Sequence, residues 1–171
     1  GKYMGKKERT FERIYAEHYQ QVYSFLHKLC RDGSAAEQLS KQTFLQAYKD
    51  IIHYKEQCEM GTWLLSIAAD EYLKYLYGKA SDSFEVNFYI TDPEAPLSEE
   101  PGYRLMKDVD ISEVKRVLTA LPEKDTEVLL LRIYGEIPYK EIAGLMGISA
   151  DSAKLIFIRT KEHVKEELFH D

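Results

Sequence analysis

Apolar residues in the first 80 positions recur every three or four residues, in stretches separated by turn residues. The first stretch covers 11–29 and is ended by the Arg-Asp-Gly-Ser turn at 31–34. Two more cover 36–51 and 63–76. This spacing predicts three amphipathic helices, and their short connections favour antiparallel neighbours. We therefore expect a helical bundle over residues 8–80.

The same periodicity returns in the last third of the chain. It predicts four helices, over residues 114–121, residues 128–135, residues 138–146 and a last stretch from Ser149 to about Leu168. Within the second of them Arg132 interrupts an apolar run, and we expect its charge to face solvent. The only alternation typical of a strand is a weak one at 84–88. These features predict an all-α chain with a four-helix unit over 113–171.

A compact corner joins the last two expected helices. Ala143 is small enough for two helix axes to approach, and Gly147 can adopt the positive φ of a tight turn. Ile148 would fill the corner, and Ser149 would cap the next helix. The pattern is typical of a DNA-binding helix-turn-helix, although a purely structural corner between two helices could carry the same residues.

Charge divides the chain into three parts. Residues 1–80 carry 12 basic and 10 acidic side chains, residues 81–112 carry 2 and 8, and residues 113–171 carry 9 and 11. The middle part also contains three prolines and lacks helical periodicity, as expected of an acidic flexible linker. The expected fold class is thus all-α, with two small helical domains joined by an acidic linker.

Several classes of function lack support in the sequence. No apolar stretch is long enough to span a membrane. Cys30 and Cys58 stand far apart without metal-ligand spacing, and we expect two reduced, buried thiols. No nucleophile elbow, phosphate-binding loop or catalytic carboxylate pair is recognisable. We expect no enzyme activity, no metal and no cofactor.

Ordered motifs connect the chain to a known family. The second half resembles the C-terminal domain of bacterial extracytoplasmic-function (ECF) sigma factors in the stretches Val117–Glu123, Glu127–Arg132, Tyr139–Ala143 and Gly147–Ser149. The first half resembles the first helix, the polymerase-binding helix and the promoter-opening helix of that family at Tyr19–Leu26, Ala36–Tyr48 and Thr62–Ala68. The resemblance covers about 130 residues in the family's order.

The resemblance implies a cytoplasmic subunit that gives RNA polymerase its promoter recognition. Its partners would be core polymerase (the beta-prime and beta subunits), promoter DNA and an anti-sigma factor. The bundle would bind core polymerase through Glu37, Gln38, Lys41, Gln42 and Phe44. The last helix would read the bases of the minus-thirty-five element with Ser149, Ala150 and Ser152 and would contact its phosphates with Lys154, Arg159 and Lys161. Stacking surfaces for the minus-ten element would come from Tyr54, Trp63 and Tyr72, although each ring could also belong to the core.

Some positions in the expected promoter-opening and recognition helices depart from the family's pattern. Ser66 and Ala69-Asp70 stand where family members usually carry arginine or Arg-Asn, and the apolar run 155–158 replaces a polar, arginine-containing stretch. Four consecutive apolar residues span all sides of a helix, so we expect Leu155 and Ile158 to form an exposed protein-interaction patch. Two other interpretations remain open, namely a sigma-like interaction module without promoter binding and a stand-alone helix-turn-helix regulator.

Overall fold

The structure is a computed structural model that describes residues 5–78, 86–89, 104–109 and 111–169. Its elements in chain order are α1 (Lys6–Cys30), α2 (Gly33–Asp50), the short 3-10 helix η1 (Ile51–His53), α3 (Met60–Gly78), β1 (Val86–Tyr89), β2 (Arg104–Val109), α4 (Ile111–Ala120), α5 (Glu123–Gly135), α6 (Tyr139–Met146) and α7 (Ala150–Phe169). The prediction of a mainly helical fold is confirmed.

Helices α1, α2 and α3 form a three-helix unit, as the periodicity predicts. Arg31 closes α1 in the left-handed conformation, with φ of 55°, and its N–H donates to the His27 carbonyl at 2.8 Å. Asp32 then caps α2 by accepting from the backbone N–H of Ser34 at 2.9 Å and of Ala35 at 3.3 Å. This local chemistry turns the chain within two residues and makes the first two helices neighbours.

Helices α4 to α7 form the second unit, and α5 corrects one expectation. Arg132 does not face solvent, since only 2% of the residue is exposed. Its Nη1 donates to the Ile137 carbonyl at 2.8 Å, and the guanidinium lies 4.8 Å from the centre of the Tyr139 ring. A planar cation can be buried when hydrogen bonding and an aromatic face replace its hydration. Arg132 therefore joins the end of α5 to the start of α6.

The segment expected to be a flexible linker contains regular structure. Strands β1 and β2 pair in antiparallel register, with Val86 opposite Val109 and Tyr89 opposite Arg104. The weak alternation at 84–88 overlaps β1, and the expectation of a flexible linker is corrected at these two paired strands. The acidic, proline-containing residues 90–103 lie outside the described part of the chain.

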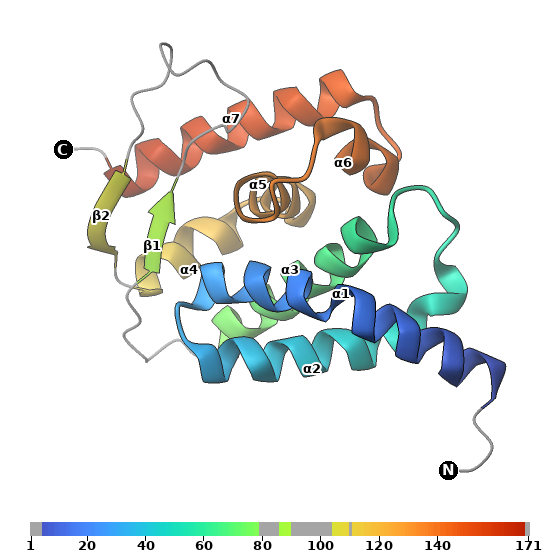
Figure 1. The fold of residues 1–171 in the computed structure, drawn as a ribbon. Coiled ribbons are helices and arrows are strands. Elements are labelled where there is room, and N and C mark those ends of the chain that lie inside the picture. The colour runs from blue at the N-terminus through green and yellow to red at the C-terminus, as the bar shows by residue number, and fades with distance from the viewer. Residues whose placement is uncertain (1–4, 79–85, 90–103, 110, 170–171) are drawn as a thin grey trace.

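One core runs through both helical units. In Figure 1, α7 and α2 lie on opposite sides of the molecule, with α3 and α5 between them. Helix α3 is buried on nearly every side, including Leu65, Ala69, Tyr72 and Leu76. A helix covered all round must have partners on more than one face, and α3 packs on α1 and α2 in its own unit and on α5 in the second. The second unit therefore covers the helix expected to open promoter DNA.

Candidate functional site

The corner between α6 and α7 has the geometry of a helix-turn-helix. Gly147 has φ of 67°, and the N–H of Ile148 donates to the Ala143 carbonyl at 3.1 Å. Ser149 caps α7, because its Oγ accepts from the backbone N–H of Ser152 at 3.1 Å. The positive φ expected of Gly147 and the capping expected of Ser149 are confirmed. An uncapped α7 would leave polar N–H groups at the end nearest any bound nucleic acid.

The outward face of α7 carries the side chains expected to meet DNA. Ser149, Ala150, Ser152 and Lys154 are exposed, and so is Arg159 further along the helix. The opposite face, which packs into the core, consists of Ala153, Phe157, Thr160 and Val164. The helix thus separates a core face from a free face, as a helix that enters a major groove requires.

Two basic residues of α7 differ in whether a DNA phosphate could reach them. Arg159 remains exposed while its Nη2 pairs with Asp125 Oδ2 at 3.3 Å. Lys161 is only 6% exposed, and its Nζ lies 5.7 Å from the centre of the Phe157 ring. The expected phosphate contact of Lys161 is therefore wrong for this conformation, because its long aliphatic stem packs inward.

The aromatic side chains proposed as stacking surfaces do not form one exposed platform. The ring of Tyr54 is half-buried and lies 5.3 Å from that of Trp63, tilted by 40°. Trp63 is buried. Tyr72 lies deep in the core, where burial raises the pKa of its hydroxyl well above the usual range. The assignment of Tyr72 as a base-stacking residue is therefore wrong for this structure, and only Tyr54 offers a partly open ring.

The outer face of α2 presents most of the side chains expected to bind polymerase. Glu37, Gln38, Lys41 and Gln42 are exposed, and Glu37 pairs with Lys41 at 3.4 Å. Phe44 is instead buried, with its ring 4.8 Å from that of Tyr15. The expectation that Phe44 faces a partner directly is corrected, because its ring belongs to the contact between α1 and α2.

An apolar groove beside this face was not expected from the sequence. It has a volume of about 480 Å³ and is lined by Phe11, Tyr15, Lys41, Phe44, Leu45 and Tyr48. Leu45 is 65% exposed at its rim. Leu45 falls outside the apolar stripe of α2, and that misplaced residue is the signal that could have revealed the groove.

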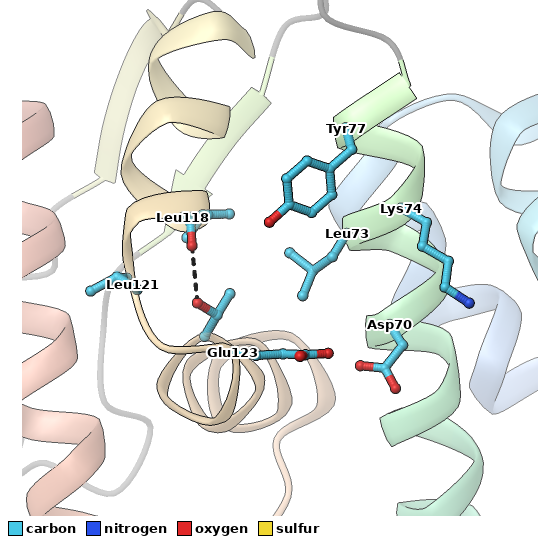
Figure 2. A pocket seen from close by; sticks show the side chains of 8 residues that line it. Asp70, Leu73, Lys74, Tyr77, Leu118, Leu121 and Glu123 are labelled. Carbon is cyan, nitrogen blue, oxygen red and sulfur yellow. Dashed lines mark hydrogen bonds between the residues drawn. The ribbon is translucent and has the colours of Figure 1, made fainter.

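Acidic side chains meet where the two helical units join. A cavity of about 210 Å³ lies between α3 and the α4–α5 corner, and Figure 2 shows Asp70 and Glu123 facing one another across it. Burial raises the pKa of Asp70 to about 6, and Glu123 adds to the effect. Burial and the charge of Asp70 raise the pKa of Glu127, about one turn further along α5, to about 8. The boundary therefore concentrates negative charge that protonation would relieve.

Within the described part of the chain, no group of three His, Cys, Asp or Glu side chains could hold a metal ion. The same residues include no helix that is long and apolar enough to cross a membrane. Cys30 and Cys58 are both buried free thiols.

Family models match both helical units. The model described as Sigma-70 region 2 matches residues 14–81, and the model described as Sigma-70, region 4 matches residues 111–155. Among curated relatives, the RNA polymerase sigma factor CarQ of Myxococcus xanthus is 30% identical over 165 residues, covering 93% of this chain and 89% of the relative. The chain belongs to the ECF RNA polymerase sigma factors.

Further relatives of this sigma factor extend over nearly its whole length. The ECF RNA polymerase sigma factor SigM of Bacillus subtilis is 27% identical, covering 91% of this chain and 93% of the relative. The fold also resembles that of the sigma factor RpoE in a co-crystal structure with the anti-sigma factor NepR from Bartonella quintana. That likeness has a TM-score of 0.51 and 18% identity, covering 95% of this chain and 99% of the other. CnrH, solved in complex with the cytosolic domain of CnrY, gives a TM-score of 0.50 at 14% identity, covering 92% and 86% of the two chains.

The two matched regions place the candidate surfaces within the sigma factor. Region 2 covers α1 from Ile14 onward, α2 and α3, with the polar α2 face and most of the groove beside it. Region 4 contains the helix-turn-helix, and its match ends at Leu155, the first residue of the exposed apolar patch. Leu155 is 67% exposed and Ile158 is 40% exposed, so the region 2 unit does not cover them.

Proposed function

We propose that this sigma factor directs promoter-specific transcription initiation in the cytoplasm by binding core RNA polymerase and promoter DNA, with no catalytic activity of its own. The observation that carries the proposal is the free face of α7, which begins at a capped N-terminus and presents Ser149, Ser152 and Lys154 to solvent. Polar side chains at the start of a recognition helix are the ones that reach base edges in a major groove.

The proposal divides the contacts among three surfaces. The exposed face of α2, from Glu37 to Gln42, would bind the beta-prime subunit, with the apolar groove supplying buried area beside it. The segment 54–63 would hold the minus-ten element, with the partly open ring of Tyr54 as its stacking surface and the buried Trp63 packed against it. Helix α7 would read the minus-thirty-five element. Joining two weak readers in one chain raises their combined affinity, because the second contact becomes intramolecular.

We also propose that an anti-sigma factor controls this protein. Both RpoE and CnrH were solved as complexes, the former with an anti-sigma factor. In this chain the exposed Leu155 and Ile158 form an apolar patch on the DNA-facing helix. A protein bound there would exclude water from the two side chains and would block the approach of α7 to DNA at the same time.

Reconstitution with purified core polymerase tests the main proposal. The chain should co-elute with core polymerase and should yield transcripts from discrete positions on genomic fragments of its host. The matched variants are Ser152→Glu and His163→Glu, both at exposed positions of α7. Glu at position 152 completes a capping box with Ser149, so the fold should be preserved while a negative charge enters the DNA contact.

We expect Ser152→Glu to abolish the promoter-dependent transcripts and His163→Glu to retain them. Absence of both co-elution and discrete transcripts from the parent would overturn the proposal. Co-elution without transcripts from any fragment would instead favour the sigma-like interaction module.

A further inference from the structure

Side chains of the second unit meet both ends of α3. At the N-terminal end, Glu141 Oε1 accepts from the backbone N–H of Glu59 at 2.8 Å and from the Thr62 hydroxyl at 2.9 Å. At the C-terminal end, Lys115 Nζ donates to the Tyr77 carbonyl at 3.0 Å. A helix of this length places these two contacts about 28 Å apart.

The contact at Glu141 reproduces a capping box between two different helices. Glu59 precedes α3, and its carbonyl accepts from the N–H of Trp63 at 3.1 Å, as an N-cap residue does. In a capping box the third helical residue supplies a carboxylate to the N-cap N–H. In α3 the third helical residue is Thr62, which has no carboxylate. Glu141 of α6 supplies the carboxylate in its place.

The charges of the two contacts also match the polarity of α3. A helix carries a partial positive charge at its start and a partial negative charge at its end. The second unit brings an anion, Glu141, to the start and a cation, Lys115, to the end. Reversing the direction of α3 relative to the second unit would place both charges at the wrong ends. The contacts therefore specify one orientation of the two units.

Close backbone approach completes the contact between α6 and the loop before α3. A Cβ placed on Gly144 would lie 2.2 Å from the carbonyl oxygen of Gln57. Only glycine allows α6 this close to the loop, although alanine would be preferred in the interior of a free helix.

We infer that this arrangement is a closed state held by a latch, consisting of Glu141, Gly144 and Lys115, which must open before segment 54–63 can bind single-stranded DNA. This gating role rests on the proposed function of that segment, whereas the latch itself rests only on the contacts above. In the closed state α6 occupies the start of α3, while the free face of α7 stays open. The closed form thus retains one DNA reader and withholds the other.

Distance measurements on the full chain test the latch. Donor and acceptor dyes are attached at Lys49→Cys on α2 and His163→Cys on α7, both exposed positions. Cys58→Ser is made in every labelled protein, because Cys58 lies in the segment that opening would expose. The native Cys30 should label slowly, because burial raises the pKa of its thiol to about 12. Energy transfer is then compared among the parent, Glu141→Ala, Lys115→Ala, Gly144→Ala and the control Lys140→Ala, an exposed neighbour on α6.

The three latch variants should lower the energy transfer, and Lys140→Ala should match the parent. For Glu141→Ala we expect about a tenfold shift of the equilibrium towards the open state. Gly144→Ala is informative because it strengthens the intrinsic helix preference of α6 while it obstructs the contact. Equal transfer in all five proteins would overturn the latch.

Binding of two DNA probes tests the gating role. The probes are a single-stranded oligonucleotide and a duplex, taken respectively from the minus-ten and minus-thirty-five regions of a promoter that the reconstituted enzyme transcribes. Opened variants should bind the single strand about tenfold more tightly than the parent and the duplex equally well. Lower transfer without tighter single-strand binding would overturn the gating role. Lower transfer with no binding of either probe by any variant would contradict the proposed function and leave the latch standing.

Discussion

The carboxylate of Asp70 on α3 faces that of Glu123 on α5 across the boundary between the two units (Figure 2). Glu127 extends this acidic group along α5, and its pKa is raised to about 8 by burial and by the charge of Asp70. Like charges in a poorly solvated place oppose each other. The boundary that the latch closes therefore also contains a repulsive element whose strength depends on pH.

The closed state should lose stability as the pH rises. Burial raises the pKa of Asp70 to about 6 and that of Glu127 to about 8, so the closed form holds protons that the open form releases. Closure is most favoured at a pH below the ordinary pKa of a carboxyl group. It weakens as the pH rises through the raised pKa values of Asp70 and Glu127. The negative charges of Glu123 and Glu71 raise the pKa of Asp70, and the positive charge of Lys74 lowers it. Glu123 also raises the pKa of Glu127. Energy transfer in the labelled chain should fall between pH 6 and pH 8.

The variant Glu127→Gln isolates the upper part of that pH dependence. It removes the charge with little change of volume, so energy transfer at pH 8 should exceed that of the parent. Glu12→Gln, at an exposed position of α1, is the matched control and should follow the parent curve. A parent curve that is flat over this range would contradict the assignment of these carboxyls to the boundary.

Removal of the buried guanidinium should be costly for the fold. In Arg132→Ala the Ile137 carbonyl loses its donor and the Tyr139 ring loses the cation that lies over it. We expect a loss of about 2–4 kcal/mol in the free energy of unfolding. Arg116→Ala is the control, since its pair with Glu167 at 3.3 Å is largely exposed and should contribute less than about 1 kcal/mol. Urea unfolding followed by circular dichroism compares the two, and similar midpoints would contradict the structural role of Arg132.

Local signals were sufficient to predict the helices and the corner near the C-terminus. Gly147 and Ser149 act on atoms within four residues of themselves, so their effect can be read from neighbouring positions in the sequence. The same holds for Asp32 at the start of α2. The pairing of β1 with β2 depends on partners from separate parts of the sequence, and there the sequence offered only a weak alternation.

Side-chain environments set by distant helices could not be predicted in this way. Glu141 meets Glu59 and Thr62 across 82 and 79 positions, and helical periodicity contains no information about such pairs. Tyr72 and Lys161 were misassigned for a related reason. An aromatic ring or a long basic stem on a helix can face either solvent or core, and the packing of neighbouring helices decides which.

The groove between α1 and α2 should contribute to polymerase binding. Leu45 lies at its rim with 65% of the residue exposed, so Leu45→Ser should barely change the unfolding midpoint. If a polymerase surface covers the groove, the same substitution should weaken binding about tenfold, because a buried leucine contributes roughly 1.5–3 kcal/mol. Ile52→Ser is the control, since Ile52 is exposed but does not line the groove. Equal affinities of both variants for core polymerase would exclude the groove from the interface.

Phosphate contacts by α7 should be visible in the salt dependence of DNA binding. Lys154 and Arg159 are exposed on the free face of the helix, and Arg159 can exchange its pair with Asp125 for a phosphate. Each lost phosphate contact lowers the slope of log affinity against log salt by about 0.9. Lys154→Ala combined with Arg159→Ala should therefore flatten the slope for a minus-thirty-five duplex by about 2. Lys28→Ala, at an exposed position near the end of α1, should leave it unchanged. An unaltered slope in the double variant would mean that DNA approaches another face of the helix-turn-helix.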